Sequence, residues 1–221
     1  MERHLFLFGG GPPFPPELAA RFAELAGGAD GLVSILCVDR PGWEEYMPHY
    51  TKALEERGVA RFRCLPLPTT PESEAMEALR ASSGIIIGGG DTNRYADYIV
   101  ETEIGSVVAA RFEAGIPVAG FSAGALLSPD RCLISPKDNE DSAYQDRRGL
   151  GLVHGISIAV HFSQWQEEKQ LLASADRYPD YRAHYGLDED CGLYFRNGGL
   201  ERTEGEGVFV LEDGVIGKVV L

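Results

Sequence analysis

Cysteine is scarce in this chain, and its few cysteines are widely spaced. The four residues, Cys37, Cys64, Cys132 and Cys191, lie tens of positions apart. This matches neither the short ligand spacing of a zinc site nor the dense pattern of a small disulfide-stabilised domain. We therefore expect no metal site, and a reducing, cytoplasmic setting is the simplest interpretation.

Positive charge and long apolar runs are also in short supply. The chain has 20 Lys and Arg against 34 Asp and Glu, which gives a formal net charge of −14. Because such a protein repels phosphate backbones and anionic lipid, nucleic acid and membrane surfaces are excluded as expected partners. The apolar run near the N-terminus covers only five residues, too few for a signal-peptide core. No run reaches the length of a membrane span, so we expect the whole chain to be the mature protein.

The sequence instead contains short apolar runs that alternate with amphipathic stretches, over 221 residues of which 44% are hydrophobic. The pattern predicts an α/β three-layer sandwich with a mostly parallel central sheet and helices on both faces. The predicted strands are 4–8, 32–38, 61–67, 84–87, 117–121 and 156–162. The predicted helices are 16–26, 43–57, 72–81, 95–114 and about 164–177. Turn residues at 197–199 and 213–214 predict antiparallel hairpins at the C-terminal edge.

No linker, repeat or charge block divides the chain, so residues 1–221 are predicted to form a single domain. The least regular stretch is 128–150. A loop of that length is uncommon inside a compact domain, which suggests a functional role for it.

A candidate nucleophile lies at residues 120–124, which read Gly-Phe-Ser-Ala-Gly. This G-x-S-x-G pattern follows a predicted strand and begins a helix, as in a nucleophile elbow. Ser122 would then lie at a helix N-terminus, where free amides favour the negative charge of acyl transfer. On the five residues alone, the alternative of a simple N-cap serine is equally acceptable.

A serine nucleophile needs a base, and His161 is the best candidate among the five histidines. It ends the apolar run 155–160, at the edge where α/β sheets place ligands. A carboxylate must hold the imidazole in turn. The residue types leave four candidates open in the irregular stretch: Asp130, Asp138, Glu140 and Asp141.

Three glycines, Gly88 to Gly90, follow the buried strand 84–87. Their amides can approach a ligand closely, so the loop is either an oxyanion hole or a phosphate cradle. No Lys-Ser or Lys-Thr follows, and the spacing does not match a dinucleotide fingerprint, so no cofactor is expected. A second glycine run, 9–11, continues into prolines without amide donors and is interpreted as a structural turn.

In the chain order glycine loop, serine turn and histidine strand, these three motifs resemble peptidase family S51. This family includes peptidase E, an α-aspartyl dipeptidase, and the cyanophycinases, and its fold is similar to that of class I glutamine amidotransferases. The segments 149–153 and 186–190 extend the resemblance over essentially the whole chain. It implies Ser122 as nucleophile, His161 as general base, and amides of Gly89 or Gly90 with Ala123 as oxyanion donors. It also implies Glu140 as the triad acid, with Asp138 as the alternative. The resemblance also implies that the protein forms a homodimer.

The resemblance further implies a small peptide as substrate, with dipeptides carrying an N-terminal aspartate as the expected class. The candidate substrate-binding residues are Asp91, Asn93, Arg94 and Lys137. Cyanophycinases carry arginines after the His-Phe pair, whereas residues 163–169 here read Ser-Gln-Trp-Gln-Glu-Glu-Lys, which argues against polymer cleavage. Three alternatives stay open: a cyanophycinase-like hydrolase, an esterase, and a binding module without catalysis. Glutamine amidotransfer is not expected, because serine stands where those enzymes carry cysteine.

Overall fold

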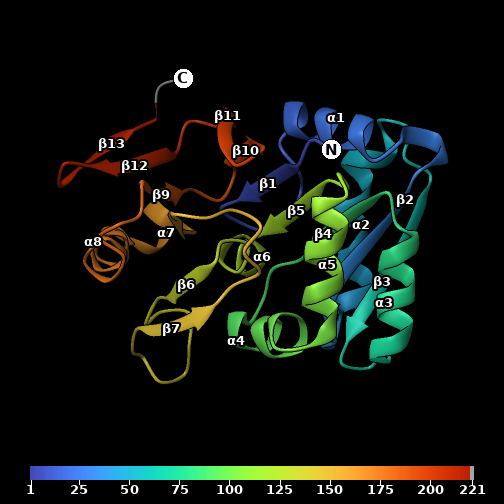
Figure 1. Cartoon of the computed structure of the whole chain (residues 1–221), viewed down its shortest axis with the longest axis horizontal. Helices are drawn as coiled ribbons and strands as arrows, with labels where there is room; N and C mark the ends of the chain where they lie inside the picture. Colours follow the sequence, from blue (N-terminus) through green and yellow to red (C-terminus); the bar gives the residue numbers. More distant parts are fainter. Residues whose placement is uncertain (220–221) are drawn as a thin grey trace.

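The central sheet contains seven strands in the order β11-β10-β1-β5-β4-β2-β3 (Figure 1). The computed structural model describes residues 1–219. The parallel strands are β1 (His4–Phe8), β5 (Val118–Phe121), β4 (Gly84–Ile87), β2 (Leu32–Val38) and β3 (Arg61–Leu67). The hairpin of β10 (Gly192–Arg196) and β11 (Gly199–Glu204) adds two antiparallel strands at one edge. The predicted mostly parallel sheet with an antiparallel hairpin is confirmed.

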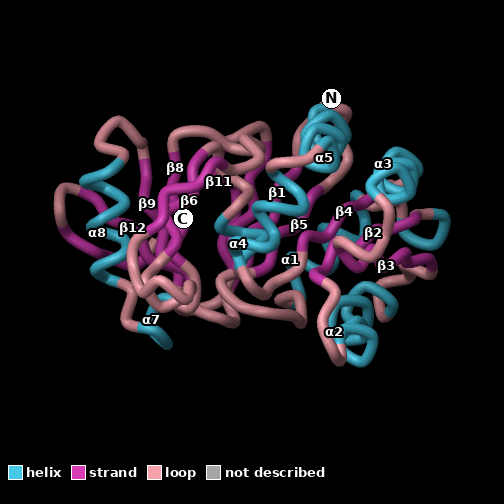
Figure 2. Tube along the Cα trace, turned by 90° about the horizontal axis from the view of Figure 1, so that it is seen from below, coloured by secondary structure: helices cyan, strands magenta, loops and turns pink. Residues whose placement is uncertain are grey.

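Helices cover both faces of this sheet, because the side chains of its buried strands alternate between the faces. In β2, Val33 and Ile35 contribute to one core and Leu36 and Val38 to the other. The helices are α1 (Pro16–Leu25) and α2 (Trp43–Glu55) on the first core, and α3 (Glu72–Ala81) and α5 (Glu103–Glu113) on the second. Figure 2 shows α2 on one side of the strands and α3 and α5 on the other.

A second sheet lies beside the first and was not predicted as a separate unit. Its four strands follow the order β13 (Val215–Lys218), β12 (Val208–Glu212), β9 (Ala183–Leu187) and β8 (Ile156–Ala159). Strands β8 and β9 are parallel, and α8 (Glu168–Arg177) packs against both. The predicted hairpin turn at 213–214 joins β12 to β13.

Two other stretches differ from their predictions. The predicted helix 95–114 is divided into α4 (Thr92–Tyr95), a π-helical turn η2 (Ala96–Val100) and α5. The division arises at Thr102, whose hydroxyl accepts a hydrogen bond from the amide of Ile104 and so caps α5. The irregular stretch 128–150 contains a hairpin of β6 (Arg131–Ile134) and β7 (Gln145–Arg148).

The remaining elements are short. They are the 3₁₀ turn η1 (Gly28–Asp30), α6 (Ala123–Leu126) and α7 (Phe162–Trp165). All four cysteines are unpaired. Among residues 1–219, no helix has both the length and the apolar character needed to cross a membrane.

Candidate active site

Strand β5 runs into a sharp turn at Ser122, where α6 begins. Ser122 has φ 47° and ψ −105°, a conformation that side-chain-bearing residues rarely adopt. Close approach of the chain explains two of the glycines: a Cβ atom at Gly120 would lie 2.4 Å from the Gly124 carbonyl oxygen, and one at Gly124 would lie 2.3 Å from that of Ile87. The strand-to-helix turn expected of a nucleophile elbow is therefore present.

His161 lies beside this serine. Its Nε2 atom is 2.9 Å from Oγ of Ser122. The end of β1 holds both residues, since the amide of Ser122 donates to the carbonyl of Phe8 (3.0 Å) and the amide of His161 donates to that of Gly9 (2.9 Å). The glycine run 9–11 is thus the turn that brings the serine and the histidine together.

A carboxylate meets the other ring nitrogen of His161. Its Nδ1 atom is 2.8 Å from Oε1 of Glu189, in the turn between β9 and β10. The parallel register of β8 and β9 pairs Ala159 with Gly186. His161 follows Ala159 by two residues and Glu189 follows Gly186 by three, so both lie just beyond the same end of the paired strands. The pairing of the second sheet therefore delivers this glutamate to the imidazole.

The two predicted acids lie elsewhere, and the expected assignment is corrected. Glu140 is exposed and has no side-chain hydrogen bond or ion pair within residues 1–219. Asp138 accepts a hydrogen bond from the hydroxyl of Thr92 at 2.6 Å. Burial raises the pKa of Asp138 to about 6, against the opposing effects of Thr92 and His161. Neither contacts the imidazole, because the loop that carries them packs toward α4, whereas Glu189 follows the strand beside His161.

Only some of the predicted oxyanion donors have a free amide in the structure. The amide of Gly89 donates to the hydroxyl of Tyr50 at 2.9 Å and is therefore engaged within the protein. The amides of Gly90 and Ala123 have no acceptor in the described part of the chain. Ala123 is the first residue of α6, where N–H groups lack partners within the helix. Of the three predicted donors, Gly90 and Ala123 remain available.

The stacking of Trp165 on His161 was not predicted. The two ring centroids are 4.2 Å apart, and the ring planes differ by 20°. The amide of Trp165 also donates to the carbonyl of His161 at 2.7 Å. The indole thus restricts the rotation of the imidazole while its two nitrogens bond to Ser122 and Glu189.

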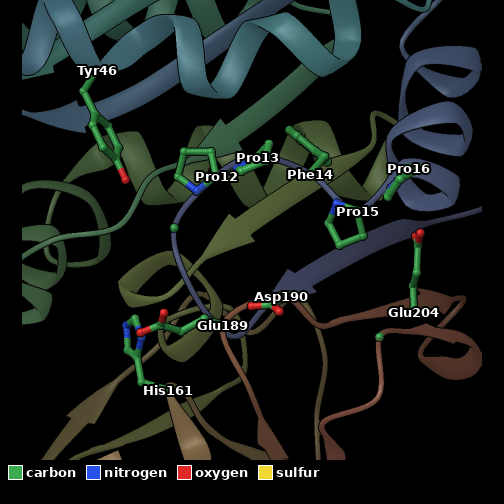
Figure 3. A pocket seen from close by; sticks show the side chains of 12 residues that line it. Pro12, Pro13, Phe14, Pro15, Pro16, Tyr46, His161, Glu189, Asp190 and Glu204 are labelled. Carbon is green, nitrogen blue, oxygen red and sulfur yellow. The ribbon is translucent and has the colours of Figure 1, made fainter. Parts of the chain in front are cut away.

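Two cavities open near these residues. One, of about 710 Å³, is lined by His161, Glu189, Asp190, Tyr46 and the segment 11–16, among others (Figure 3). The other, of about 680 Å³, reaches Gly90. The second cavity gathers all the predicted substrate-binding residues, Asp91, Asn93, Arg94 and Lys137, together with both predicted acids.

Most of these predicted binding residues already have partners within the protein. Asp91 caps α4 and pairs with Arg94, whose Nε lies 3.6 Å from its carboxylate. Asn93 donates to Gln145 and accepts from Arg147. The ammonium of Lys137 donates to the carbonyl oxygens of Trp165 and Gln166.

Arg40 is the cation that the sequence reasoning missed. It is exposed in the second cavity, has no carboxylate within 4.0 Å in the described part of the chain, and places its guanidinium carbon 5.7 Å from the ring centroid of Tyr46. The position of Arg40 in the sequence could have indicated a binding role. Arg40 follows the carboxyl end of β2, and α/β sheets bind ligands at that edge.

The chain is similar to proteins of one known family. The model of peptidase family S51 matches residues 40–203. Proteins named cyanophycinase from Trichormus variabilis and a Nostoc species are each 27% identical over 172 residues, which cover 74% of this chain and 57% of theirs. The chain thus spans just over half the length of these curated relatives.

Two solved structures share the fold. A peptidase from an acI-B1 actinobacterium superposes with a TM-score of 0.69 at 20% identity, over 96% of this chain and 88% of its own. A putative peptidase E from Listeria monocytogenes EGD-e also superposes with a TM-score of 0.69 at 20% identity, over 92% of this chain and 98% of its own. On the family match and this shared architecture, the chain belongs to peptidase family S51.

Proposed function

We propose that the protein is a serine peptidase that hydrolyses the bond after an N-terminal aspartyl residue of small peptides. The observation that carries the proposal is the 2.9 Å contact between Oγ of Ser122 and Nε2 of His161, on a turn strained at φ 47°. A serine hydroxyl with a base in hydrogen-bonding reach is the minimal apparatus of acyl transfer. Membership of S51 and a peptidase E-like fold support the same chemistry.

The residues take the following roles in this proposal. His161 removes the proton of Ser122 as Oγ bonds to the peptide carbonyl carbon, and Glu189 stabilises the resulting imidazolium. The amides of Gly90 and Ala123 receive the developing oxyanion. His161 then gives the proton to the departing nitrogen as the carbon–nitrogen bond breaks. Water activated by His161 hydrolyses the acyl-enzyme and restores Ser122.

The second cavity supplies the aspartyl side of the substrate. It borders the Gly90 amide and holds Arg40, a cation without a carboxylate partner in the described residues. A guanidinium binds a carboxylate through paired, charge-assisted hydrogen bonds. Arg40 is therefore the residue that we assign to the aspartate side chain, in place of the already bonded Arg94 and Lys137.

The test is a peptide panel in which the first residue is Asp, Glu, Asn or Ala. We expect hydrolysis of the aspartyl peptides, loss of turnover in Ser122→Ala with unchanged folding, and a selective rise in KM for aspartyl peptides in Arg40→Met. Labelling by a fluorophosphonate probe checks the serine directly. Native turnover by Ser122→Ala would refute the proposal, and a protein that binds aspartyl peptides without probe labelling would be a binding module.

Polymer hydrolysis is the second candidate, because the curated relatives are named cyanophycinase. The panel therefore includes cyanophycin polymer beside the peptides. Release of soluble product from the polymer at a rate above that of every peptide would favour this candidate. Faster hydrolysis of simple acyl esters than of all peptides would favour the esterase.

A further inference from the structure

The cavity beside His161 is not the one assigned to the aspartyl residue in the proposed function, and its lining residues point to a different role. Figure 3 shows the imidazole and Glu189 at one end, the hydroxyl of Tyr46 directed toward the space, and a row of prolines along one side. At about 710 Å³, the cavity is within the usual size range of ligand sites.

Its position relative to the reacting atoms identifies it as the leaving-group side. His161 must protonate the departing nitrogen, so that nitrogen lies close to Nε2. His161 lines this cavity, whereas Gly90 and Arg40 line the other. The acyl portion therefore extends toward Arg40, and the leaving segment extends along His161 into the proline-lined cavity.

The proline row offers few hydrogen-bond donors to a ligand. Pro12, Pro13, Pro15 and Pro16 have no backbone N–H, so Phe14 supplies the only amide in this five-residue stretch. A peptide carboxylate needs several donors or a cation when it leaves water. This wall suits apolar groups and provides no anion site.

The start of a helix beside this cavity already binds a carboxylate of the protein itself. Helix α1 begins at Pro16, and the N–H groups at such a helix start attract carboxylates. Here the amides of Glu17 and Leu18 donate to the carboxylate of Glu204, at 3.0 and 2.8 Å. These two amides are thus bonded to Glu204 and are not free to bind a ligand carboxylate.

The charged groups on the cavity are all negative. Glu189, Asp190 and Glu204 line it, and no Lys or Arg of residues 1–219 does. The side chain of Asp190 is exposed and has no hydrogen bond or ion pair in the described chain. Arg40 stands against Tyr46 but lines the other cavity.

We propose that this cavity is a leaving-group subsite that selects against a free α-carboxylate on the first leaving residue. The inference rests on the proposed function and refines it: the preferred substrates are aspartyl peptides that continue beyond the second residue or end in an amide. A basic or apolar side chain on the first leaving residue is favoured, and an acidic one is disfavoured.

The test compares substrates with the same aspartyl half. Asp–Leu carries the free carboxylate, Asp–Leu-amide lacks it, and Asp–Leu–Leu moves it one residue further. At low ionic strength we expect kcat/KM for the amide and the tripeptide to exceed that of Asp–Leu by about five- to tenfold, the size of a charge repulsion across several ångströms. The ratio falls toward one as salt screens the carboxylates.

The side-chain preference is tested with amides, so that only one charge changes at a time. We expect kcat/KM to be highest for Asp–Lys-amide, followed by Asp–Leu-amide and then Asp–Glu-amide. Reversal of this order, or equal rates for all three, would overturn the proposal.

Two variants link the effect to the cavity. Asp190→Asn lowers the amide-to-acid ratio, and Asp190→Lys lowers it further, because a cation then faces the carboxylate. Asp213→Lys, in the turn between β12 and β13, makes the same charge change away from the site and leaves the ratio at the wild-type value. The ratio is internal to each variant, so a general loss of activity does not affect it.

Failure of this proposal is distinguishable from failure of the proposed function. Aspartyl p-nitroanilide has an uncharged leaving group, and its hydrolysis by the wild type but not by Ser122→Ala establishes the serine chemistry alone. If it is hydrolysed while Asp–Leu and its amide react equally fast, the leaving-group proposal is wrong and the peptidase proposal stands. If neither the anilide nor any aspartyl peptide is cleaved, both are wrong.

Discussion

At the scale of single residues, the candidate site depends on which carboxylate meets His161. The sequence singled out Ser122 and His161 because each ends a buried strand, and strand ends meet at one edge of the sheet. The sequence did not identify Glu189 as the acid, because its position depends on the pairing of β8 with β9. This pairing brings Oε1 of Glu189 to 2.8 Å from Nδ1 of His161. Residue spacing from the serine carries no information about that pairing.

The first prediction separates Glu189 from Glu140 as the acid that acts on His161. Glu189→Gln is expected to lower kcat by about 10²- to 10⁴-fold, because the imidazole loses the charge that fixes its tautomer and stabilises its cation. Glu140→Gln is expected to leave kcat within about threefold of the wild-type value. Any effect should be on KM, because Glu140 lines the cavity that reaches Gly90 and does not contact His161. Steady-state kinetics on an aspartyl peptide measures both. Equal losses of kcat in the two variants would contradict the assignment.

A second prediction at this scale concerns Trp165, which stacks on His161 at 4.2 Å between centroids. Aromatic stacking contributes about 0.5–1.5 kcal/mol, so Trp165→Leu is expected to lower kcat by about two- to tenfold. KM stays nearly unchanged because the indole lines neither cavity. Trp165→Phe retains a stacking ring and restores most of kcat. A loss confined to KM would mean that Trp165 binds substrate instead of orienting the base.

At the scale of elements, strand ends and one helix together position the catalytic backbone. The end of β1 accepts hydrogen bonds from the amides of Ser122 and His161, and α2 contributes Tyr50 to the glycine loop. The sequence predicted β1 and α2 with nearly correct bounds, because their apolar periodicities are strong. The sequence did not reveal the contact of Tyr50 with Gly89. A buried aromatic residue on a helix cannot be told apart from a core residue until the structure shows where its hydroxyl group points.

The element-scale prediction is that Tyr50→Phe weakens both the fold and the reaction. The half-buried amide of Gly89 loses its acceptor at 2.9 Å, which is expected to cost about 1 kcal/mol of unfolding free energy, the low end of the range for an unpaired buried group. Movement of the neighbouring Gly90 amide also lowers kcat. Tyr95→Phe is the matched variant, because both hydrogen bonds of the Tyr95 hydroxyl are longer, at 3.3 Å. Denaturant unfolding and kinetics should show the larger effect for Tyr50→Phe.

At the scale of the whole molecule, the sequence predicted the central sheet well and its neighbour poorly. The runs 4–8, 32–38 and 84–87 have the predicted bounds, because these strands are buried on both faces and are almost continuously apolar. The edge strand 61–67 also has the predicted bounds, although it is only partly buried. The separation of β8 into a second sheet was missed. A short apolar run does not specify its partner, and β8 pairs with β9, whose sequence Ala-His-Tyr-Gly-Leu has little apolar alternation.

The molecule also carries a half-buried acid, Asp138, that makes its stability depend on pH. Asp138 accepts a hydrogen bond from Thr92, and partial burial raises the pKa of this carboxyl to about 6 from its ordinary value of 3.8. A carboxyl whose pKa is raised by folding stabilises the protein while it is protonated and loses that contribution as pH rises through the folded value. The wild type is therefore expected to lose stability from this group between pH 5 and pH 8.

Asp138→Asn tests this because the amide oxygen still accepts the Thr92 hydrogen bond but carries no charge. Relative to the wild type, the variant should gain about 1–2 kcal/mol of unfolding free energy on going from pH 5 to pH 8. Denaturant titrations at the two pH values measure the gain, and Glu140→Gln, an exposed neutralisation two residues away in the same loop, controls for the change in net charge. A gain of the same size in both variants would show that loop charge, and not the burial of Asp138, sets the pH dependence.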